Sequence, residues 1–130
     1  MLIIGFGNPL RGDDAFGLRA AERIGDAIAV HQLTPELMDP IARATRVLFL
    51  DATSEGIPGE IRRRPVEPSR LAGAFTHHAT PEALLAGALA LYGRAPAAEI
   101  VTVCGANFAI ADELSPPVEA SLAKVIAELT

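Results

Sequence analysis

Residues 2–27 read LIIGF-GNPLRG-DDAFGLRAAERIGDA, which is an apolar run, a turn-rich loop and then a helical pattern. Leu2 to Phe6 is predicted to be a buried strand, because the run is short and apolar and is followed by glycine-rich sequence. From Asp13 onward, apolar residues recur on one helical face and charged residues fall mostly on the other. A strand, a loop and a helix in this order indicate the first unit of an α/β sheet.

Four further segments of the chain have the composition of strands. Two are apolar and expected inside the sheet, one is weaker and one is charged: Val47–Leu50, Ile100–Val103, Ala29–Leu33 and Glu60–Val66. The charged segment contains Arg62-Arg63-Arg64. We interpret this basic run as part of a charged edge strand in preference to a binding patch, because charge on an edge strand discourages unwanted pairing.

Three later helices are predicted from a hydroxyl residue followed by proline, at Thr34-Pro35, Thr80-Pro81 and Ser115-Pro116. The hydroxyl is expected to accept a hydrogen bond from a free N–H of the first turn, and proline has no N–H to lose there. Strands and helices alternate, which predicts an α/β fold with a mostly parallel sheet and helices on both faces. The length predicts a single domain over residues 1–130.

The composition excludes several classes of protein. A net charge of −5 argues against a surface for nucleic acid or an anionic membrane. The single cysteine, Cys104, excludes an intrachain disulfide, fits a reducing compartment and is expected to be a buried structural thiol. We see no signal peptide and no membrane-spanning segment, so a cytoplasmic location is expected.

The first loop superficially suggests a dinucleotide site, but it lacks the necessary pattern. The third glycine of G-x-G-x-x-G would fall at Leu10, and the helix that follows begins with Asp13 and Asp14, whose carboxylates would repel phosphate. An acidic pair suits a cation, although either acid alone could instead cap the helix. Asn8 could donate to a substrate carbonyl or could stabilise the loop.

Other polar residues are expected at the same edge of the sheet. Asp51 ends the apolar strand, and His77 and His78 come just before the helix that begins after Thr80. Two acids and a histidine from three separate loops could form a set of oxygen and nitrogen ligands with open metal positions. The spacing is not a compact zinc signature, and Asp51 could instead cap the loop that starts at Ala52.

The opening motif, Gly5-x-Gly7-Asn8-x-Leu10-x-x-Asp13-Asp14-x-x-Gly17, resembles that of the hydrogenase maturation endopeptidases. These enzymes remove the C-terminal extension of the large subunit of nickel–iron hydrogenases. Later features follow in the order found in this family: Asp51-Ala52 after an apolar strand, His78 before a helix rich in alanine and leucine, and a final helix after a strand. The resemblance implies a three-layer α/β/α sandwich of the phosphorylase/hydrolase-like kind, with a five-stranded sheet that includes one antiparallel strand.

The resemblance also implies the chemistry of the site. Asp14 and Asp51 would be catalytic and, together with His78, would be the metal ligands, with His77 as the competitor of His78. Nickel would arrive already bound to the hydrogenase precursor, which is the expected partner, and zinc or another divalent metal could substitute. A water deprotonated by Asp14 or Asp51 is one possible nucleophile, and a metal used for recognition alone is the other possibility. A non-catalytic module that checks or carries nickel is the rival function.

One segment departs from the family pattern. Many relatives carry a glycine-rich segment resembling Asp-Gly-Gly-Thr after the second strand, whereas residues 31–37 read HQLTPEL here. The substrate cleft is expected to differ at this position.

Overall fold

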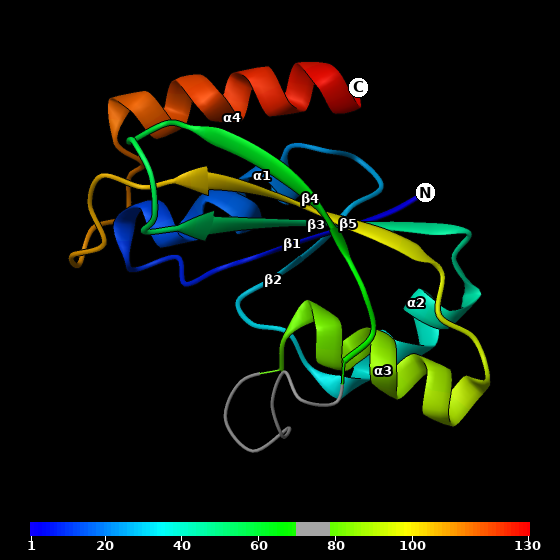
Figure 1. The fold of residues 1–130 in the computed structure, drawn as a ribbon. Helices are drawn as coiled ribbons and strands as arrows, with labels where there is room; N and C mark the ends of the chain where they lie inside the picture. The colour runs from blue at the N-terminus through cyan, green and yellow to red at the C-terminus, as the bar shows by residue number, and fades with distance from the viewer. Residues whose placement is uncertain (70–78) are drawn as a thin grey trace.

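The computed structural model describes residues 1–69 and 79–130 (Figure 1). Its elements follow one another as β1 (Leu2–Phe6), the 3-10 helix η1 (Gly12–Ala15), α1 (Phe16–Glu22), β2 (Ile28–Val30), η2 (Pro35–Leu37), α2 (Met38–Arg43), β3 (Arg46–Thr53), β4 (Ile61–Val66), α3 (Pro81–Tyr92), β5 (Ala97–Cys104) and α4 (Pro116–Leu129). The predicted strands are all present, although β2 is shorter and begins earlier than expected.

The strands form one five-stranded sheet in the order β2-β1-β3-β5-β4. β1 pairs in parallel with β2 and β3, and β3 pairs in parallel with β5. β4 is antiparallel to β5 and lies at the edge. The predicted mostly parallel sheet with one antiparallel strand is therefore confirmed, as are the central place of β3 and the edge position of the arginine-containing strand.

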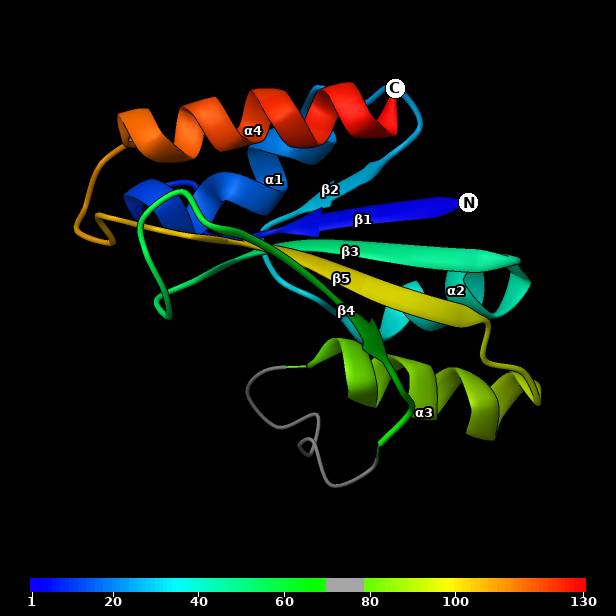
Figure 2. The same cartoon turned by 45° about the horizontal axis from the view of Figure 1, so that its top comes forward.

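Helices cover both faces of the sheet, which gives the predicted three layers. α1 and α4 lie on one face, and α2 and α3 lie on the other (Figures 1 and 2). Successive side chains of a strand point to opposite faces, so Phe49 packs in the core beneath α2 and α3, whereas Leu48 and Leu50 pack in the core beneath α1 and α4. Cys104 is buried, as predicted.

α3 and α4 begin at the predicted prolines, whereas Pro35 begins the 3-10 helix η2 and α2 follows from Met38. Only one of the three predicted caps is present. Thr80 Oγ1 accepts a hydrogen bond of 3.1 Å from the N–H of Ala83. Thr34 makes no such bond, and the Ser115 hydroxyl donates to Asp13 Oδ2 at 2.7 Å instead. The prediction was wrong at Ser115 because a buried carboxylate is a stronger partner for the hydroxyl than a backbone N–H.

The first helix packs very closely on the sheet. A Cβ added at Gly17 would overlap the carbonyl oxygens of Leu50 and Phe6, and one added at Gly5 would overlap the carbonyl oxygen of Gly17. These contacts explain Gly5 and Gly17 of the opening motif, because only glycine lets the backbones approach this far.

We expect Gly17→Ala to lower the free energy of unfolding by about 2 kcal/mol or more, because α1 must move away from β1 and β3. Gly25→Ala is the matched control, since a Cβ at Gly25 meets no atom within 4 Å. Urea denaturation of both variants measures the difference. Equal stability of the two would contradict the close packing of α1.

None of the helices in the described parts of the chain is long and apolar enough to cross a membrane.

Candidate active site

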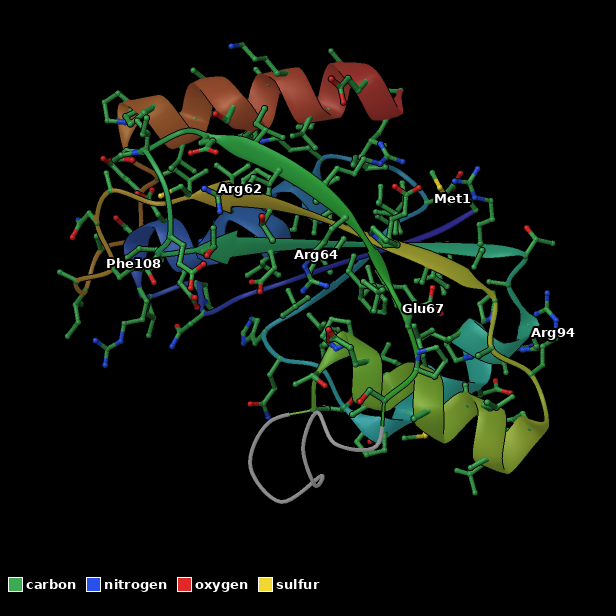
Figure 3. All side chains as sticks on the ribbon, in the orientation of Figure 1. Met1, Arg62, Arg64, Glu67, Arg94 and Phe108 are labelled. Atoms are coloured by element: carbon green, nitrogen blue, oxygen red, sulfur yellow. The ribbon has the colours of Figure 1, made fainter. Side chains whose placement is uncertain are left out.

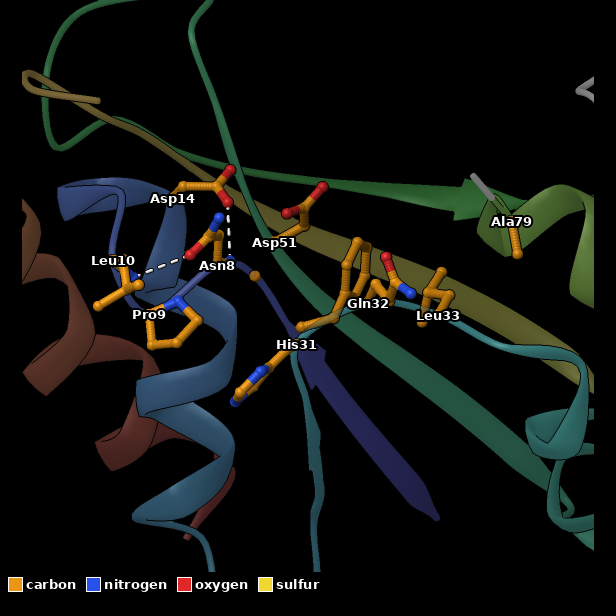
Figure 4. Close-up of a pocket in the computed structure, with 11 residues that line it drawn as sticks. Asn8, Pro9, Leu10, Asp14, His31, Gln32, Leu33, Asp51 and Ala79 are labelled. Atoms are coloured by element: carbon orange, nitrogen blue, oxygen red, sulfur yellow. Dashed lines mark hydrogen bonds between the residues drawn. The ribbon is translucent and has the colours of Figure 1, made fainter. Parts of the chain in front are cut away.

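A pocket of about 570 Å³ lies at the carboxyl ends of β1, β2 and β3 (Figure 4). The first loop forms one side, from Phe6 to Leu10, and residues 31–33 form another. Asp14 and Asp51 both line it, as predicted for one edge of the sheet. The carboxyl edge of a parallel sheet is where side chains of separate loops converge, which explains why residues distant in sequence meet here.

The first loop is held by its own polar groups. Asn8 Oδ1 accepts a hydrogen bond of 2.9 Å from the N–H of Leu10, and Asp14 Oδ2 accepts one of 2.8 Å from the N–H of Asn8. Gly12 has a φ of +54°, a conformation that favours glycine. The Asn8 side chain therefore stabilises the loop, and the loop in turn orients the Asp14 carboxylate toward the pocket.

Asp51 lies within β3, which continues to Thr53, so it is not the last residue of the strand as the sequence suggested. Its Oδ1 accepts a hydrogen bond of 2.8 Å from the N–H of Ala52. Burial of the carboxyl, with a smaller contribution from the charge of Asp14, raises the pKa of Asp51 to about 7. At neutral pH this carboxyl exists in both protonation states, which suits a group that accepts and returns a proton.

The two adjacent acids of the opening motif have different roles. Asp13 is fully buried and accepts hydrogen bonds from the N–H groups of Ala106, Asn107 and Ser115 and from the Ser115 hydroxyl, at 2.7–3.0 Å. Burial alone would raise the pKa of Asp13, but these hydrogen bonds outweigh it and lower the pKa below its usual value. Neither acid is the N-cap of η1, which is Arg11. Asp13 instead fastens the segment before α4 to the first loop.

Several solved structures with this architecture are of hydrogenase maturation proteases. The hydrogenase maturating endopeptidase HybD from E. coli is 23% identical over 98% of this chain and 88% of its own, with a TM-score of 0.74. The maturation protease HycI from Thermococcus kodakarensis is 22% identical over 98% and 88%, with a TM-score of 0.75. The hydrogenase 2 maturation peptidase from a Thaumarchaeota archaeon is 26% identical over 98% and 94%, with a TM-score of 0.70.

The chain has the fold of the hydrogenase maturation endopeptidases. No protein-family model matches the sequence, and no curated protein matches it significantly. The likeness to the maturation endopeptidases nevertheless extends over nearly the whole chain, and it agrees with the resemblance of the opening motif.

The histidine of the expected ligand set is His78, with His77 as its competitor. His77 and His78 lie outside the described residues, so the three-ligand set stays a prediction. Ala79, which follows His78 in the sequence, lines the same pocket as Asp14 and Asp51. Within residues 1–69 and 79–130, no three His, Cys, Asp or Glu side chains are grouped closely enough to hold a metal ion.

Two pocket residues were not identified from the sequence. His31 and Gln32 follow β2 and line the pocket across from the first loop (Figure 4). They belong to the segment that departs from the maturation endopeptidase pattern. Their place in the pocket could have been predicted from the strand expected at Ala29–Leu33, because the carboxyl end of a parallel strand lies at the same edge of the sheet as Asp51.

Proposed function

We propose that the protein is an endopeptidase that removes the C-terminal extension of a nickel–iron hydrogenase large-subunit precursor. The observation that carries the proposal is the pair of carboxylates, Asp14 and Asp51, in one pocket of a maturation endopeptidase fold. The raised pKa of Asp51 adds to this, since a carboxyl that titrates near neutral pH is characteristic of acid–base catalysis. The location that suits such a precursor is the cytoplasm.

Nickel enters this proposal as part of the substrate. Asp14, Asp51 and His78 would contact a nickel ion that the precursor already holds, so that a precursor without nickel is left uncut. The mutual repulsion of the two carboxylates supports a cation here, because a positive charge between them relieves it. Carboxylate and imidazole ligands also accept zinc or other divalent metals, which could replace nickel.

Asp51 is proposed to act on the attacking water. Its carboxylate accepts a proton from the water as the oxygen attacks the scissile carbonyl carbon, and it returns the proton to the leaving amine. Asp14, fixed by the N–H of Asn8, would orient the substrate and the water at the pocket. A divalent ion bound there would lower the pKa of the water.

The test is incubation of the protein with a nickel-loaded precursor and with the same precursor lacking nickel. We expect a shortened product only from the loaded precursor. Binding of the loaded precursor without any shortening would instead favour the module that checks or carries nickel.

We expect the isolated protein to bind nickel or zinc weakly, because three protein ligands leave the coordination sphere incomplete and the proton on Asp51 must be displaced. Isothermal titration calorimetry with and without chelator measures the affinity. A stoichiometric metal that survives purification would contradict a metal delivered by the substrate.

A further inference from the structure

The arginine-rich strand β4 borders a second hollow of the described surface. Arg62, Arg63 and Arg64 line this hollow of about 650 Å³ together with Thr53, Glu55 and Thr102. Arg62 and Arg64 lie along β4 (Figure 3). The position of this hollow relative to Asp51 follows from the strand register.

The register places the hollow next to the candidate active site. Asp51 of β3 pairs with Thr102 of β5, and Thr102 pairs with Arg62 of β4. Paired residues point to the same face of a sheet, so Asp51, Thr102 and Arg62 form a row on one face, and Arg64 follows two residues after Arg62 on that face. The pocket that contains Asp51 and the hollow that contains Thr102 therefore adjoin at this pair.

The two arginines on this face keep hydrogen-bond donors available. Arg62 forms an ion pair with Glu60 through its Nε at 2.9 Å. The Nη1 of Arg64 makes a 3.5 Å contact with the Pro65 carbonyl and a 3.6 Å ion pair with Glu82. Within the described residues, both terminal nitrogens of Arg62 and the Nε and Nη2 of Arg64 make no hydrogen bond to the protein. Both side chains are about half exposed, so these donors can reach a ligand.

Arg63 differs from its two neighbours. Its Nε and Nη2 donate to the two carboxylate oxygens of Glu99 at 2.8 and 3.3 Å. Arg63 borders the hollow, but its pairing with Val101 puts its side chain on the opposite face of the sheet from Arg62, where Glu99 holds the guanidinium. Arg63 is therefore already neutralised by a two-point ion pair, and it offers a control on the same strand.

We propose that Arg62 and Arg64, with Thr102, form a subsite for an acidic side chain of the peptide substrate. This rests on the proposed endopeptidase function. The unused donors of these two guanidinium groups suit a carboxylate, because they can form charge-assisted and two-point hydrogen bonds with it. The net charge of −5 disfavours a large polyanion such as nucleic acid but not a single carboxylate.

The distance between Asp51 and Arg62 predicts the position of the acidic residue in the peptide substrate. Strands lie about 4.8 Å apart, so Arg62 is about 10 Å from Asp51 across two strand spacings. An extended peptide covers about 3.4 Å per residue. The acidic residue of the substrate should therefore lie about three residues from the scissile peptide bond at Asp51.

The test is an NMR titration with two N-acetylated and C-amidated serine–glycine heptapeptides, one with a central Glu and the other with a central Gln. We expect the Glu peptide alone to shift the signals of Thr102, Arg62 and Arg64. The double variant Arg62→Gln with Arg64→Gln should raise its Kd roughly three- to tenfold, whereas Arg63→Gln should leave it unchanged. Added salt should weaken the binding.

Equal shifts with the Gln peptide, no localised shifts, or unchanged binding by the double variant would overturn the subsite. Tighter binding of a Gln peptide with a free C-terminus would overturn the assignment to a side chain. These readouts require no cleavage, so they decide the subsite even if the protein cuts no precursor. If it does cut, the double variant should raise KM for a precursor with this acidic residue and leave kcat nearly unchanged.

Discussion

Asp51→Asn is expected to reduce precursor cleavage by at least about 10³-fold and, at the same time, to make the protein more stable above pH 7. The loss of activity follows because an amide cannot accept the proton from the attacking water. Asp14→Ala and His78→Ala are also expected to abolish cleavage. The gain in stability follows from the raised pKa of Asp51.

The pKa of Asp51 differs between the folded and the unfolded protein, and this difference decides how stability changes with pH. The pKa of Asp51 is about 7 in the folded protein and near the ordinary value of 3.8 when unfolded. The wild type therefore loses stability as the pH rises above about 4, and the full penalty is present above about 7. A pKa shift of this size lowers the free energy of unfolding of the wild type by about 4 kcal/mol at most. We expect Asp51→Asn to be about 1–4 kcal/mol more stable than the wild type at high pH, because the site relaxes around the charged carboxylate.

Urea denaturation at pH 4 and pH 8, paired with cleavage assays, measures both effects. The stabilities of wild type and Asp51→Asn should converge at pH 4 and separate at pH 8. Loss of stability in Asp51→Asn at pH 8 would show that Asp51 supports the fold.

Asp13→Ala is expected to lower the free energy of unfolding by about 3–5 kcal/mol, because it removes a fully buried carboxylate that accepts hydrogen bonds from the N–H groups of Ala106, Asn107 and Ser115. The pKa of Asp13 is lowered in the folded state, so the wild-type advantage should be present above about pH 4 and should shrink as the pH falls through the folded-state pKa.

Asp112→Ala, at an exposed acid of the same segment, is the control for Asp13→Ala and should change stability by less than about 0.5 kcal/mol. Chemical denaturation of both variants measures the contrast. An Asp13→Ala protein as stable as the control would show that the carboxylate does not fasten this segment.

The sequence was sufficient to predict the strands but not the different roles of Asp13 and Asp14. The strands could be predicted because apolar runs such as Val47–Leu50 are short and bounded by turn residues. That Asp13 binds the segment before α4 while Asp14 lines the pocket could not be predicted. The partners of Asp13 are 93, 94 and 102 residues away, so no local pattern marks them.

The site itself was predictable in part. Asp14 and Asp51 could be brought together because parallel strands deliver their carboxyl ends to one edge. The raised pKa of Asp51 depends on burial by the surrounding chain, which periodicity does not show. The row from Asp51 through Thr102 to Arg62 depends on strand register and on β4 lying beside β5, although β4 precedes β5 by a whole helix.

The most direct measurement is the intact mass of a nickel-loaded large-subunit precursor after incubation with the wild type and, separately, with Asp51→Asn. The proposed function predicts that the wild type removes the mass of the C-terminal extension and that Asp51→Asn, folded and at the same concentration, leaves the precursor whole. A precursor that is bound but uncut by the wild type, or cut equally by Asp51→Asn, would contradict it.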